Sequence, residues 1–340
     1  MLDPDSEIEF TVIITAYNRR DFLLKSLNSV LSQKLPRSAY EIIVSKDFED
    51  VEIDKIFKEK GARLIYNQKP GIGQRLHECI SISRGRIIAF LEDDDMWLDN
   101  RLSIVLQEFS NDKKLGYYHN SYLPINEAEK TTKEWIHHKN IKETKRLSQK
   151  TDFSQILSDI MRFSPNFNLS SICISRELSL KLMNHLSNFF AAIDLYLFLG
   201  AISLNFNIVL DSRKLTKYMI HQSIMNKSGS FAEFQAGSLK VYQQHLESLE
   251  IMTEILSNDF IRDIAKSYSS EWAVRICILQ GRSKRFTLLK TIMTRAKLFF
   301  IRHDYSKYLF AIAIFSFLFP TVTKYSYYFY LKNSLIKYEN

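Results

Sequence analysis

The chain has few cysteines, and they form no recognisable pattern. Cys79, Cys173 and Cys277 are the three cysteines among 340 residues. No two of them make a CxxC pair or stand at the spacing of zinc ligands. Their odd number and wide separation argue against a disulfide framework and predict reduced thiols in a cytosolic compartment.

The sequence also lacks an apolar secretion signal and an apolar run long enough for a membrane-spanning helix. Residues 1–9 are acidic and have no apolar stretch, so we expect no secretion signal. Near the other end, Tyr308–Phe319 is apolar but is stopped by Pro320. This segment is shorter than the run of about 20 apolar residues that a spanning helix needs.

The composition that remains is that of a globular protein with surplus positive charge. Hydrophobic residues make up 46% and charged residues 25% of the chain, which argues against disorder. A length of 340 residues predicts two domains, or one large domain with an extension. The formal net charge of +8 indicates an anionic partner, such as a nucleotide, a nucleic acid or a lipid surface.

The first hundred residues alternate between strand and helix patterns. Short apolar runs predict four strands, at Phe10–Thr15, Tyr40–Val44, Ala62–Tyr66 and Arg86–Leu91. Helical patterns lie between them, and this alternation predicts an α/β fold with a Rossmann-like, mostly parallel sheet flanked by helices. Ligands of such sheets bind beyond the carboxyl ends of the strands, where the loops after the four strands would meet.

Four consecutive carboxylates, Glu92–Asp95, follow the fourth predicted strand directly. Like charges repel one another, and a divalent cation would remove the repulsion. Hard cations such as Mg²⁺ bind carboxylate oxygens, and in phosphate-handling sites they share their ligands between one or two carboxylates and the phosphates. The run therefore predicts a metal and nucleotide-diphosphate site, with a solvated acidic turn as the alternative.

In their order and spacing, these segments resemble the inverting family-2 glycosyltransferases, which have the GT-A fold. The resemblance is carried by Val12–Arg19, Glu41–Asp47, Asn67–Gly73 and Phe90–Trp97. It implies a nucleotide-diphosphate sugar donor, Mn²⁺ or Mg²⁺ as cofactor, and single-displacement transfer to a hydroxyl. It also implies a GT-A domain over residues 1–230, with a nucleotide-binding half at about 10–110 and an acceptor half at about 111–230.

Carried over residue by residue, the resemblance places the donor nucleotide at the strand ends. The positions that hold the base and ribose are occupied by Thr15, Ala16, Tyr17 and Arg19. Asp47 stands where the family has an acid that hydrogen-bonds the base. The family usually has two adjacent acids and a glycine there, whereas Lys46–Phe48 keeps one acid, which leaves the identity of the base open.

Two glycines and the acidic run complete the expected donor site. Gly71 and Gly73 match glycines that let the backbone approach the nucleotide, although both also fit an ordinary turn. Glu92–Asp94 corresponds to the family's DXD motif, with Glu in place of the first Asp. The resemblance places Glu92 and Asp93 beside the nucleotide, with Glu92 on the ribose or a metal-bound water.

The expected metal contacts come from two parts of the chain. Asp94 is the expected metal ligand, and Asp95 supports either the metal or the nucleotide. His221 lies in Lys217–Ser223, which resembles a late basic segment of the family, and it would close over the donor as a metal or diphosphate contact. A histidine without such a role is the alternative.

The acceptor half is expected to supply the general base. Phe189–Leu199 resembles the family segment that carries it, with Ile193–Asp194 in place of the usual Glu-Asp pair. Asp194 would take the proton of the attacking hydroxyl. The alternative is an acid that stabilises a helix N-terminus. Upstream of it, Pro165–Ser175 is predicted to be a strand.

Residues 231–340 form a separate, helical C-terminal region. Between Gly281 and Asn340 there are eleven basic residues and two acidic ones. Together with the apolar Tyr308–Phe319 and the tyrosines of Tyr325–Tyr330, this charge predicts a segment that lies in the interface of an anionic membrane. A helix buried against the domain or a second subunit is the alternative, so a homo-oligomer stays open.

We therefore expect a cytoplasmic enzyme, peripheral on the inner face of the cell membrane, that glycosylates a lipid-linked glycan or another acceptor of cell-envelope polysaccharide synthesis. We expect no nucleic-acid partner, because phosphate binding needs charge but no apolar segment of this kind. The alternative is a degenerate, non-catalytic nucleotide-sugar-binding or membrane scaffold protein, for which the departures at Glu92, Lys46 and Ile193 leave room.

Overall fold

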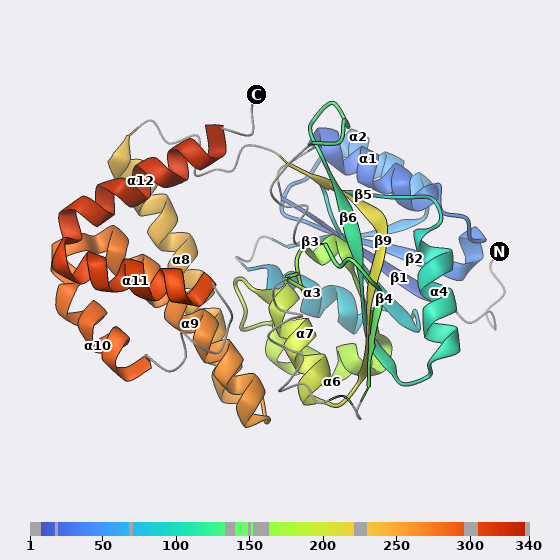
Figure 1. Cartoon of the computed structure of the whole chain (residues 1–340). Coiled ribbons are helices and arrows are strands. Elements are labelled where there is room, and N and C mark those ends of the chain that lie inside the picture. Colours follow the sequence, from blue (N-terminus) through green and yellow to red (C-terminus); the bar gives the residue numbers. More distant parts are fainter. Residues whose placement is uncertain are drawn as a thin grey trace. The chain divides into compact units, whose positions relative to one another are not determined.

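The computed structural model describes residues 8–17, 20–67, 71–132, 140–148, 151, 163–220, 230–295 and 305–336. The chain divides into two compact units. Unit 1 comprises residues 1–152 and 163–220, and unit 2 comprises residues 153–162 and 221–340. Figure 1 shows an α/β unit and an all-helical unit, and each is described by itself.

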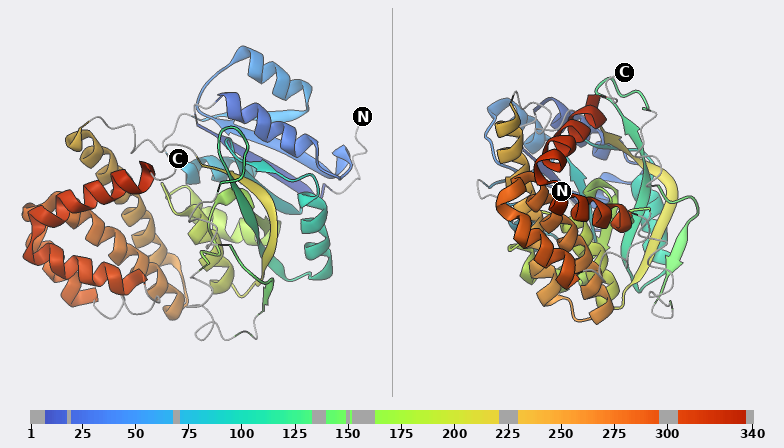
Figure 2. Two further views of the ribbon diagram at one scale, coloured as in Figure 1. Left: turned by 45° about the horizontal axis from the view of Figure 1, so that its top comes forward. Right: turned by 60° about the vertical axis from the view of Figure 1, so that its left-hand side comes forward.

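The strands described in unit 1 form one nine-stranded sheet, in the order β3-β2-β1-β4-β8-β6-β9-β5, with β7 paired to β9 (Figures 1 and 2). The strands of its first part are β1 (Phe10–Ala16), β2 (Tyr40–Lys46), β3 (Ala62–Tyr66) and β4 (Ile87–Glu92). The strands of its second part are β5 (Met96–Trp97), β6 (Leu115–Ile125), β7 (Lys145–Leu147), β8 (Ile172–Ser175) and β9 (Asn207–Met219).

The first four strands are parallel, as their apolar runs predict. β1 pairs in parallel with both β2 and β4, and β2 with β3. The register places Ile14 beside both Val44 and Leu91, so the loops after these strands leave the sheet at the same edge. This confirms the α/β expectation, while the second part of the sheet is mixed because β8 is antiparallel to both β4 and β6.

Helices cover both faces of this sheet. On one face, α1 (Arg20–Leu31), α2 (Val51–Glu59) and α4 (Arg101–Asn111) contribute side chains to the core formed with β1, β2 and β4. The other helices of unit 1 are α3 (Ile72–Ser81), α6 (Arg176–Leu186) and α7 (Ile193–Ser203). Of these, α6 contacts both α3 and α7. Short 3-10 turns, η1 (Arg37–Ala39) and η3 (Leu169–Ser171), complete the unit.

Polar residues define where two of these helices begin. The Asp50 side chain accepts hydrogen bonds from the Glu52 and Ile53 amides at the start of α2. The Ser175 side chain accepts from the Leu178 amide at the start of α6. Such N-caps satisfy amides that have no partner within the helix, so these sequences favour helix starts at these positions.

The structure differs from the sequence-based expectation between residues 115 and 175. The predicted strand Pro165–Ser175 is wrong over its first part: a turn and η3 precede β8, and Asn168 has a left-handed backbone (φ 56°). The expectation also missed β6, because its buried residues include polar ones such as His119, Asn120 and Ser121 instead of an apolar run.

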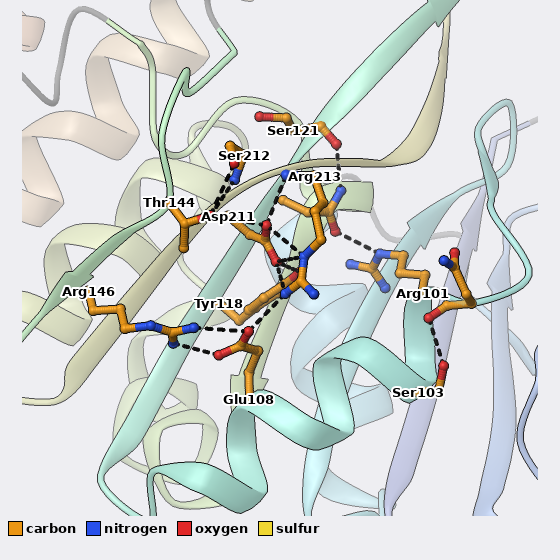
Figure 3. A network of polar contacts seen from close by, with 12 residues as sticks. Arg101, Ser103, Glu108, Tyr118, Ser121, Thr144, Arg146, Asp211, Ser212 and Arg213 are labelled. Atoms are coloured by element: carbon orange, nitrogen blue, oxygen red, sulfur yellow. Dashed lines mark hydrogen bonds and ion pairs between the residues drawn. The ribbon is translucent and has the colours of Figure 1, made fainter.

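A polar network with a buried centre, Asp211 and Tyr118, supports the second part of the sheet (Figure 3). Asp211 on β9 accepts hydrogen bonds from the Tyr118 hydroxyl (2.8 Å) and from Arg213 Nε (2.8 Å). Arg213 and Arg146 also bind Glu108 on α4, at 2.8 and 3.1 Å. Burial acts to raise the pKa of Asp211, but the hydrogen bonds and charge of Arg213 and the Tyr118 hydroxyl outweigh it, so the pKa lies below its ordinary value.

Unit 2 is helical throughout its described part. Its helices are α8 (Phe231–Ile255), α9 (Asp259–Gln280), α10 (Arg285–Arg295), α11 (Tyr305–Leu318) and α12 (Pro320–Ile336), with the 3-10 turn η5 (Gly281–Lys284) after α9. Ser230 and Glu233 form a reciprocal capping box at the start of α8. Pro320 ends the preceding apolar segment and begins α12, a position that needs no backbone amide.

The described helices include none that is both long and apolar enough to cross a bilayer. Many apolar side chains of α11, of α12 and of the residue between them are nevertheless exposed, among them Phe315, Leu318, Phe319, Val322, Phe329 and Tyr330. All three cysteines are buried free thiols, Cys79 and Cys173 in unit 1 and Cys277 in unit 2.

Candidate functional site

The candidate site lies at the carboxyl ends of β1, β2 and β4. Asp93, in the turn after β4, accepts a hydrogen bond from the Tyr17 amide at its Oδ2 atom (2.9 Å). The Asp93 amide in turn donates to the Thr15 carbonyl oxygen (3.1 Å). The structure thus brings Asp93 to the segment Thr15–Tyr17, although Asp93 is 76 residues away from Tyr17 in the sequence.

The turn that carries the acidic run is held from both sides. On one side, the Ser26 hydroxyl of α1 lies 2.8 Å from the Asp93 carbonyl oxygen and 2.6 Å from that of Asp95. On the other side, Asp95 Oδ1 accepts from the Met219 amide at the end of β9 (2.8 Å). The Asp93 and Asp95 carboxylates therefore bind backbone amides, and they fix the shape of the turn.

Solvent reaches the acids of this run unequally. Asp93 and Asp95 are almost fully buried, Asp94 keeps 8% of its surface exposed, and Glu92 is half-buried. Burial raises the pKa of Asp95, and the charges of Asp94 and Glu92 raise it further. These carboxylates are therefore close enough to repel one another, as the sequence predicts.

The residues present fit a hard divalent cation. Carboxylate oxygens are the ligands that Mg²⁺ and Mn²⁺ prefer, and the crowded charge at Glu92 and Asp94 would be relieved by a cation. In the described part of the chain, no three His, Cys, Asp or Glu side chains cluster to hold a metal by themselves.

Arg75 on α3 joins the loops after β1 and β2. Its Nη1 atom donates to the Ala16 carbonyl oxygen (3.0 Å), and its Nη2 atom lies 3.5 Å from Asp47 Oδ2. The guanidinium also lies 5.4 Å from the centre of the Tyr17 ring, which is 60% exposed. Asp47 Oδ1 is buried and has no hydrogen-bond partner among the described residues. Arg75 thus contacts both the Asp47 carboxylate and the exposed Tyr17 ring.

The departure from the family pattern at Lys46 has a structural counterpart. Lys46 is fully buried, where its ammonium group forms an ion pair with Asp54 and lies 4.5 Å from the Phe48 ring centre and 5.1 Å from that of Tyr66. Burial acts to raise the pKa of Asp54, but the hydrogen bonds of Lys46 and Tyr66 outweigh it, so the pKa is lowered. The lysine is therefore neutralised within the protein.

The two glycines lie against the segment that leads to Asp194. Gly71 has a φ of 114°, which favours glycine, and a Cβ atom there would lie 3.2 Å from the Phe190 ring. The Gly73 amide donates to the Phe189 carbonyl oxygen (3.1 Å), and a Cβ atom would lie 1.9 Å from the Leu186 carbonyl oxygen. Packing of α3 against this segment thus requires Gly73, and the nucleotide contact of both glycines stays a prediction.

Asp194 is the second residue of α7, in the first turn of the helix. Its Oδ1 atom accepts from the Leu195 amide (2.8 Å), and its Oδ2 atom accepts from the Asn166 side-chain amide (3.1 Å). Ile193, which stands where the family has an acid, is buried in the core. The position of Asp194 suits both a general base and an acid that stabilises a helix N-terminus.

The segment after Asn166 links Asp194 to the acidic run. Ser170 Oγ accepts from the Glu92 amide (3.0 Å), and its carbonyl oxygen accepts from Trp97 Nε1 (2.8 Å). Burial and the charges of Asp95, Glu92 and Asp94 raise the pKa of Tyr218, which shows that this tyrosine interacts with the acidic run. The acceptor-side acid and the donor-side acids are therefore connected through one short stretch of chain.

Several supporting residues were not found from the sequence. They are Ser26, Asp54, Asn166 and Ser170. Each is a common residue type whose partner is distant in the sequence, so no local pattern indicates its role. Arg19 and His221, the remaining predicted site residues, lie outside the residues that the structure describes.

Comparison with known sequences supports the resemblance. Residues 11–167 match the family model described as Glycosyl transferase family 2. The chain is 32% identical over 117 residues to WfaP of Escherichia coli, a UDP-Glc:alpha-D-GlcNAc-diphosphoundecaprenol beta-1,3-glucosyltransferase, covering 33% of this chain and 46% of that protein. It is 28% identical over 127 residues to TuaG of Bacillus subtilis, a putative teichuronic acid biosynthesis glycosyltransferase, covering 33% and 46%.

A third relative is an uncharacterized glycosyltransferase of Rickettsia bellii, 32% identical over 128 residues, with 36% of this chain and 18% of that protein covered. The chain thus spans less than half the length of these relatives. Among solved structures, S. aureus TarS 1–349 has a TM-score of 0.58 at 12% identity, with 94% of this chain and 91% of that chain covered. Its complex with UDP-GlcNAc gives the same TM-score at 11% identity and the same coverage.

The structural likeness establishes the shared fold, and the sequence match covers the strands and turns that build the candidate site. Over residues 11–167, just under half of its length, the chain is similar to glycosyl transferase family 2.

Proposed function

We propose that the protein is a metal-dependent, inverting glycosyltransferase that moves a sugar from a nucleotide-diphosphate sugar to a hydroxyl acceptor. The observation that carries this proposal is the hydrogen bond from the Tyr17 amide to Asp93, at 2.9 Å. It joins the expected nucleotide loop to the expected metal-binding run. We also propose that residues 1–230 act as the catalytic domain and residues 231–340 as a helical appendage.

For the donor, we propose a uridine nucleotide. TarS has been crystallised with UDP and with UDP-GlcNAc, and the name of WfaP includes UDP-Glc as donor. In this chain, the exposed Tyr17 ring and the buried, unpaired Asp47 Oδ1 atom offer a base a stacking surface and a hydrogen-bond acceptor. Thr15, Ala16, Arg19, Gly71, Gly73, Glu92 and Asp93 complete the proposed donor contacts.

For the diphosphate, we propose that Asp94 holds the cation, with Glu92 beside it and His221 closing from the segment after β9. Mn²⁺ or Mg²⁺ bound there supplies positive charge to the two phosphates as the nucleotide leaves. Asp95, buried and bonded to the Met219 amide, keeps the turn in the shape that directs Asp94. The protein's own part on this side is to orient the carboxylates and the nucleotide.

On the acceptor side, we propose that Asp194 takes the proton from the attacking hydroxyl. Asn166 donates to Asp194 Oδ2, which orients the carboxylate. Inversion then follows from one displacement, in which the acceptor oxygen forms a bond to the sugar carbon while the bond to the nucleotide phosphate breaks.

For the acceptor, we propose a lipid-linked glycan or another precursor of cell-envelope polysaccharide. WfaP is named for a diphosphoundecaprenol-linked acceptor, and TuaG for teichuronic acid biosynthesis. A peripheral position on the cytoplasmic face of the membrane is consistent with the exposed apolar side chains of α11 and α12 and with the eleven basic residues after residue 280.

Thermal unfolding with a panel of nucleoside diphosphates tests the donor site. UDP at about 100 times its dissociation constant, with Mn²⁺, should stabilise the protein by roughly 2.7 kcal/mol. The shift should require the metal and disappear in Asp94→Asn, while the matched variant Asp99→Asn, at an exposed position just after the turn, should keep it. A folded wild-type protein that responds to none of the nucleotides would indicate a non-catalytic scaffold.

Vesicle binding tests the membrane proposal. The exposed rings of Phe315 on α11 and of Phe319, the residue after this helix, have centres 5.1 Å apart. Changing both to Ser should reduce sedimentation with phosphatidylglycerol vesicles several-fold, because apolar area is lost. Val51→Ser, at an exposed apolar position of α2, is the control. Equal sedimentation of both variants and the wild type would contradict a membrane contact at this helix.

A further inference from the structure

The segment Asn166–Ser170 lies between the two chemical ends of the candidate site. Asn166 is bonded to Asp194 (3.1 Å), and Ser170 is bonded to the Glu92 amide (3.0 Å). Two residues of chain span at most about 7 Å. Asn168, the middle residue, is therefore within that distance of both Asn166 and Ser170. Along the chain, it stands between the residue bonded to the proposed base and the residue bonded to the acidic run.

The neighbouring residue fixes this segment in place. The Phe167 ring packs against Tyr122 and Tyr218, with ring centres 5.2 Å apart in both pairs. The Phe167 carbonyl oxygen accepts a hydrogen bond from His119 Nε2 (2.7 Å). Burial lowers the pKa of His119 to about 4, so this histidine is neutral and its hydrogen bond persists at physiological pH. The backbone of Asn168 is thus held by aromatic packing and a buried hydrogen bond.

Within the part of the chain that the structure describes, the Asn168 side chain has no hydrogen-bond partner. Only 6% of the residue is exposed, and neither Nδ2 nor Oδ1 makes a hydrogen bond. Buried polar groups almost always have partners, so a buried amide with none calls for an explanation. The left-handed backbone, with φ at 56°, explains why Asn or Gly is found here, since both tolerate it. It does not explain an amide group buried without a hydrogen bond.

We propose that the Asn168 side-chain amide hydrogen-bonds the hydroxyls of a sugar ring in the candidate site, and so helps to select the sugar. The inference rests on the proposed glycosyltransferase function. A side-chain amide offers donors on one atom and an acceptor on the other, so it can bind two neighbouring hydroxyls of a ring. On the proposed function, a sugar ring bound between Asp194 and Glu92 is the one carried by the donor. The acceptor sugar, which bears the attacking hydroxyl, also offers neighbouring hydroxyls and is the other ring that the amide could bind.

The variant Asn168→Gly isolates the amide from the backbone. Glycine keeps the left-handed conformation and removes both polar atoms. Asn205→Gly is the matched control, because Asn205 also has a left-handed backbone (φ 58°) but ends α7 in an exposed turn. Asn168→Asp, which keeps the size and exchanges the donor atom for an acceptor, serves as a second variant if the glycine variant does not fold.

Dissociation constants for UDP, UDP-GlcNAc and UDP-Glc, with Mn²⁺ present, test the donor sugar. We expect Asn168→Gly to bind UDP as the wild type does and to bind the preferred UDP-sugar about tenfold more weakly, as expected for one lost hydrogen-bonding group. Asn205→Gly should leave all three constants unchanged. This result would assign the amide to the transferred ring.

UDP release from the preferred UDP-sugar, with and without a panel of methyl glycosides, tests the acceptor sugar. If Asn168 binds the acceptor ring, Asn168→Gly should release UDP at the wild-type rate when no glycoside is present. The additional UDP release that a glycoside causes should be about tenfold smaller than in the wild type. The proposal is overturned if the variant matches the wild type in donor affinity and in release under both conditions. A wild-type protein that binds no nucleoside diphosphate would instead refute the proposed function itself, before any variant is compared.

Discussion

The donor side and the acceptor side of the candidate site are held by different kinds of contact. On the donor side, Asp93 and Asp95 bind the backbone amides of Tyr17 and Met219. On the acceptor side, Asp194 is held from outside its own helix by the side chain of Asn166. Backbone amides at strand ends are positioned by the sheet and do not change with residue type, whereas a side-chain contact is lost with one substitution.

This difference indicates which part of the site can vary. The donor side depends on the parallel register of β1, β2 and β4, which is fixed by a buried core. The acceptor side depends on an irregular segment, Asn166–Ser170, and on the N-terminus of one helix. We therefore expect selectivity for the sugar and the acceptor to be altered more readily than nucleotide binding.

The largest effect should come from removing the proposed base. Asp194→Asn keeps the size of the side chain and its place on α7, but it can no longer accept a proton. We expect turnover to fall by about 10²- to 10⁴-fold, while UDP still stabilises the protein as it does the wild type. Steady-state kinetics and thermal unfolding measure the two quantities. Unchanged turnover would make Asp194 an acid that only stabilises its helix.

A smaller effect should follow from breaking the buried network under the acceptor side. Asp211→Ala leaves the Tyr118 hydroxyl and the Arg213 guanidinium without their shared acceptor (Figure 3). We expect the free energy of unfolding of unit 1 to fall by about 3 kcal/mol, as for other broken buried pairs. Asp259→Asn is the control. The Asp259 side chain is 90% exposed, so its ion pair with Arg262 should contribute almost nothing to the free energy of unfolding.

The same network predicts a pH dependence. The pKa of Asp211 is lower in the folded protein than in the unfolded chain, so its ionised form stabilises the fold. That stabilisation is complete above the ordinary carboxyl pKa of about 4 and is lost as the pH falls through the folded pKa. Urea unfolding between pH 2 and 7 should show a shallower decline for Asp211→Ala than for the wild type. Parallel curves would contradict the role given to Asp211.

The smallest effect should come from disturbing the contact between α3 and the segment before Asp194. A Cβ atom at Gly73 would lie 1.9 Å from the Leu186 carbonyl oxygen, so Gly73→Ala must displace α3 or the segment before Asp194. We expect a loss of about 2 kcal/mol in the free energy of unfolding. Gly237→Ala is the matched control: nothing lies within 4 Å of its added Cβ atom in α8, and it should gain about 0.5 to 1 kcal/mol. Equal stabilities would show that α3 is not packed as described.

The sequence predicts the donor side better than the acceptor side, for a physical reason. β1 to β4 are buried on both faces and therefore appear as apolar runs. β6 escapes prediction because partners elsewhere in the chain satisfy its buried polar residues, such as Asn120 with Arg101 on α4 (2.9 Å). Asn168 interrupts the predicted strand at Pro165–Ser175, because its left-handed backbone does not fit a strand.

Within the site, the residue types were predictable and the contacts were not. Four adjacent acids predict a cation site, with a solvated acidic turn as the alternative. Which of them bind amides instead depends on partners 76 and 124 residues away, at Tyr17 and Met219. The roles of Asp94 as metal ligand, of Asp194 as base and of Gly71 at the nucleotide stay predictions.

The three buried thiols allow unfolding to be followed in the native protein without any substitution. Burial raises the pKa of Cys79 to about 12 and that of Cys277 to about 11, and it raises the pKa of Cys173 as well. Because the thiolate is the reactive form, a thiol reagent modifies these cysteines only when the surrounding structure opens. Cys79 and Cys173 report on unit 1 and Cys277 on unit 2. Labelling rates followed by mass spectrometry would therefore give the opening free energies of the two units separately, in one unmodified chain.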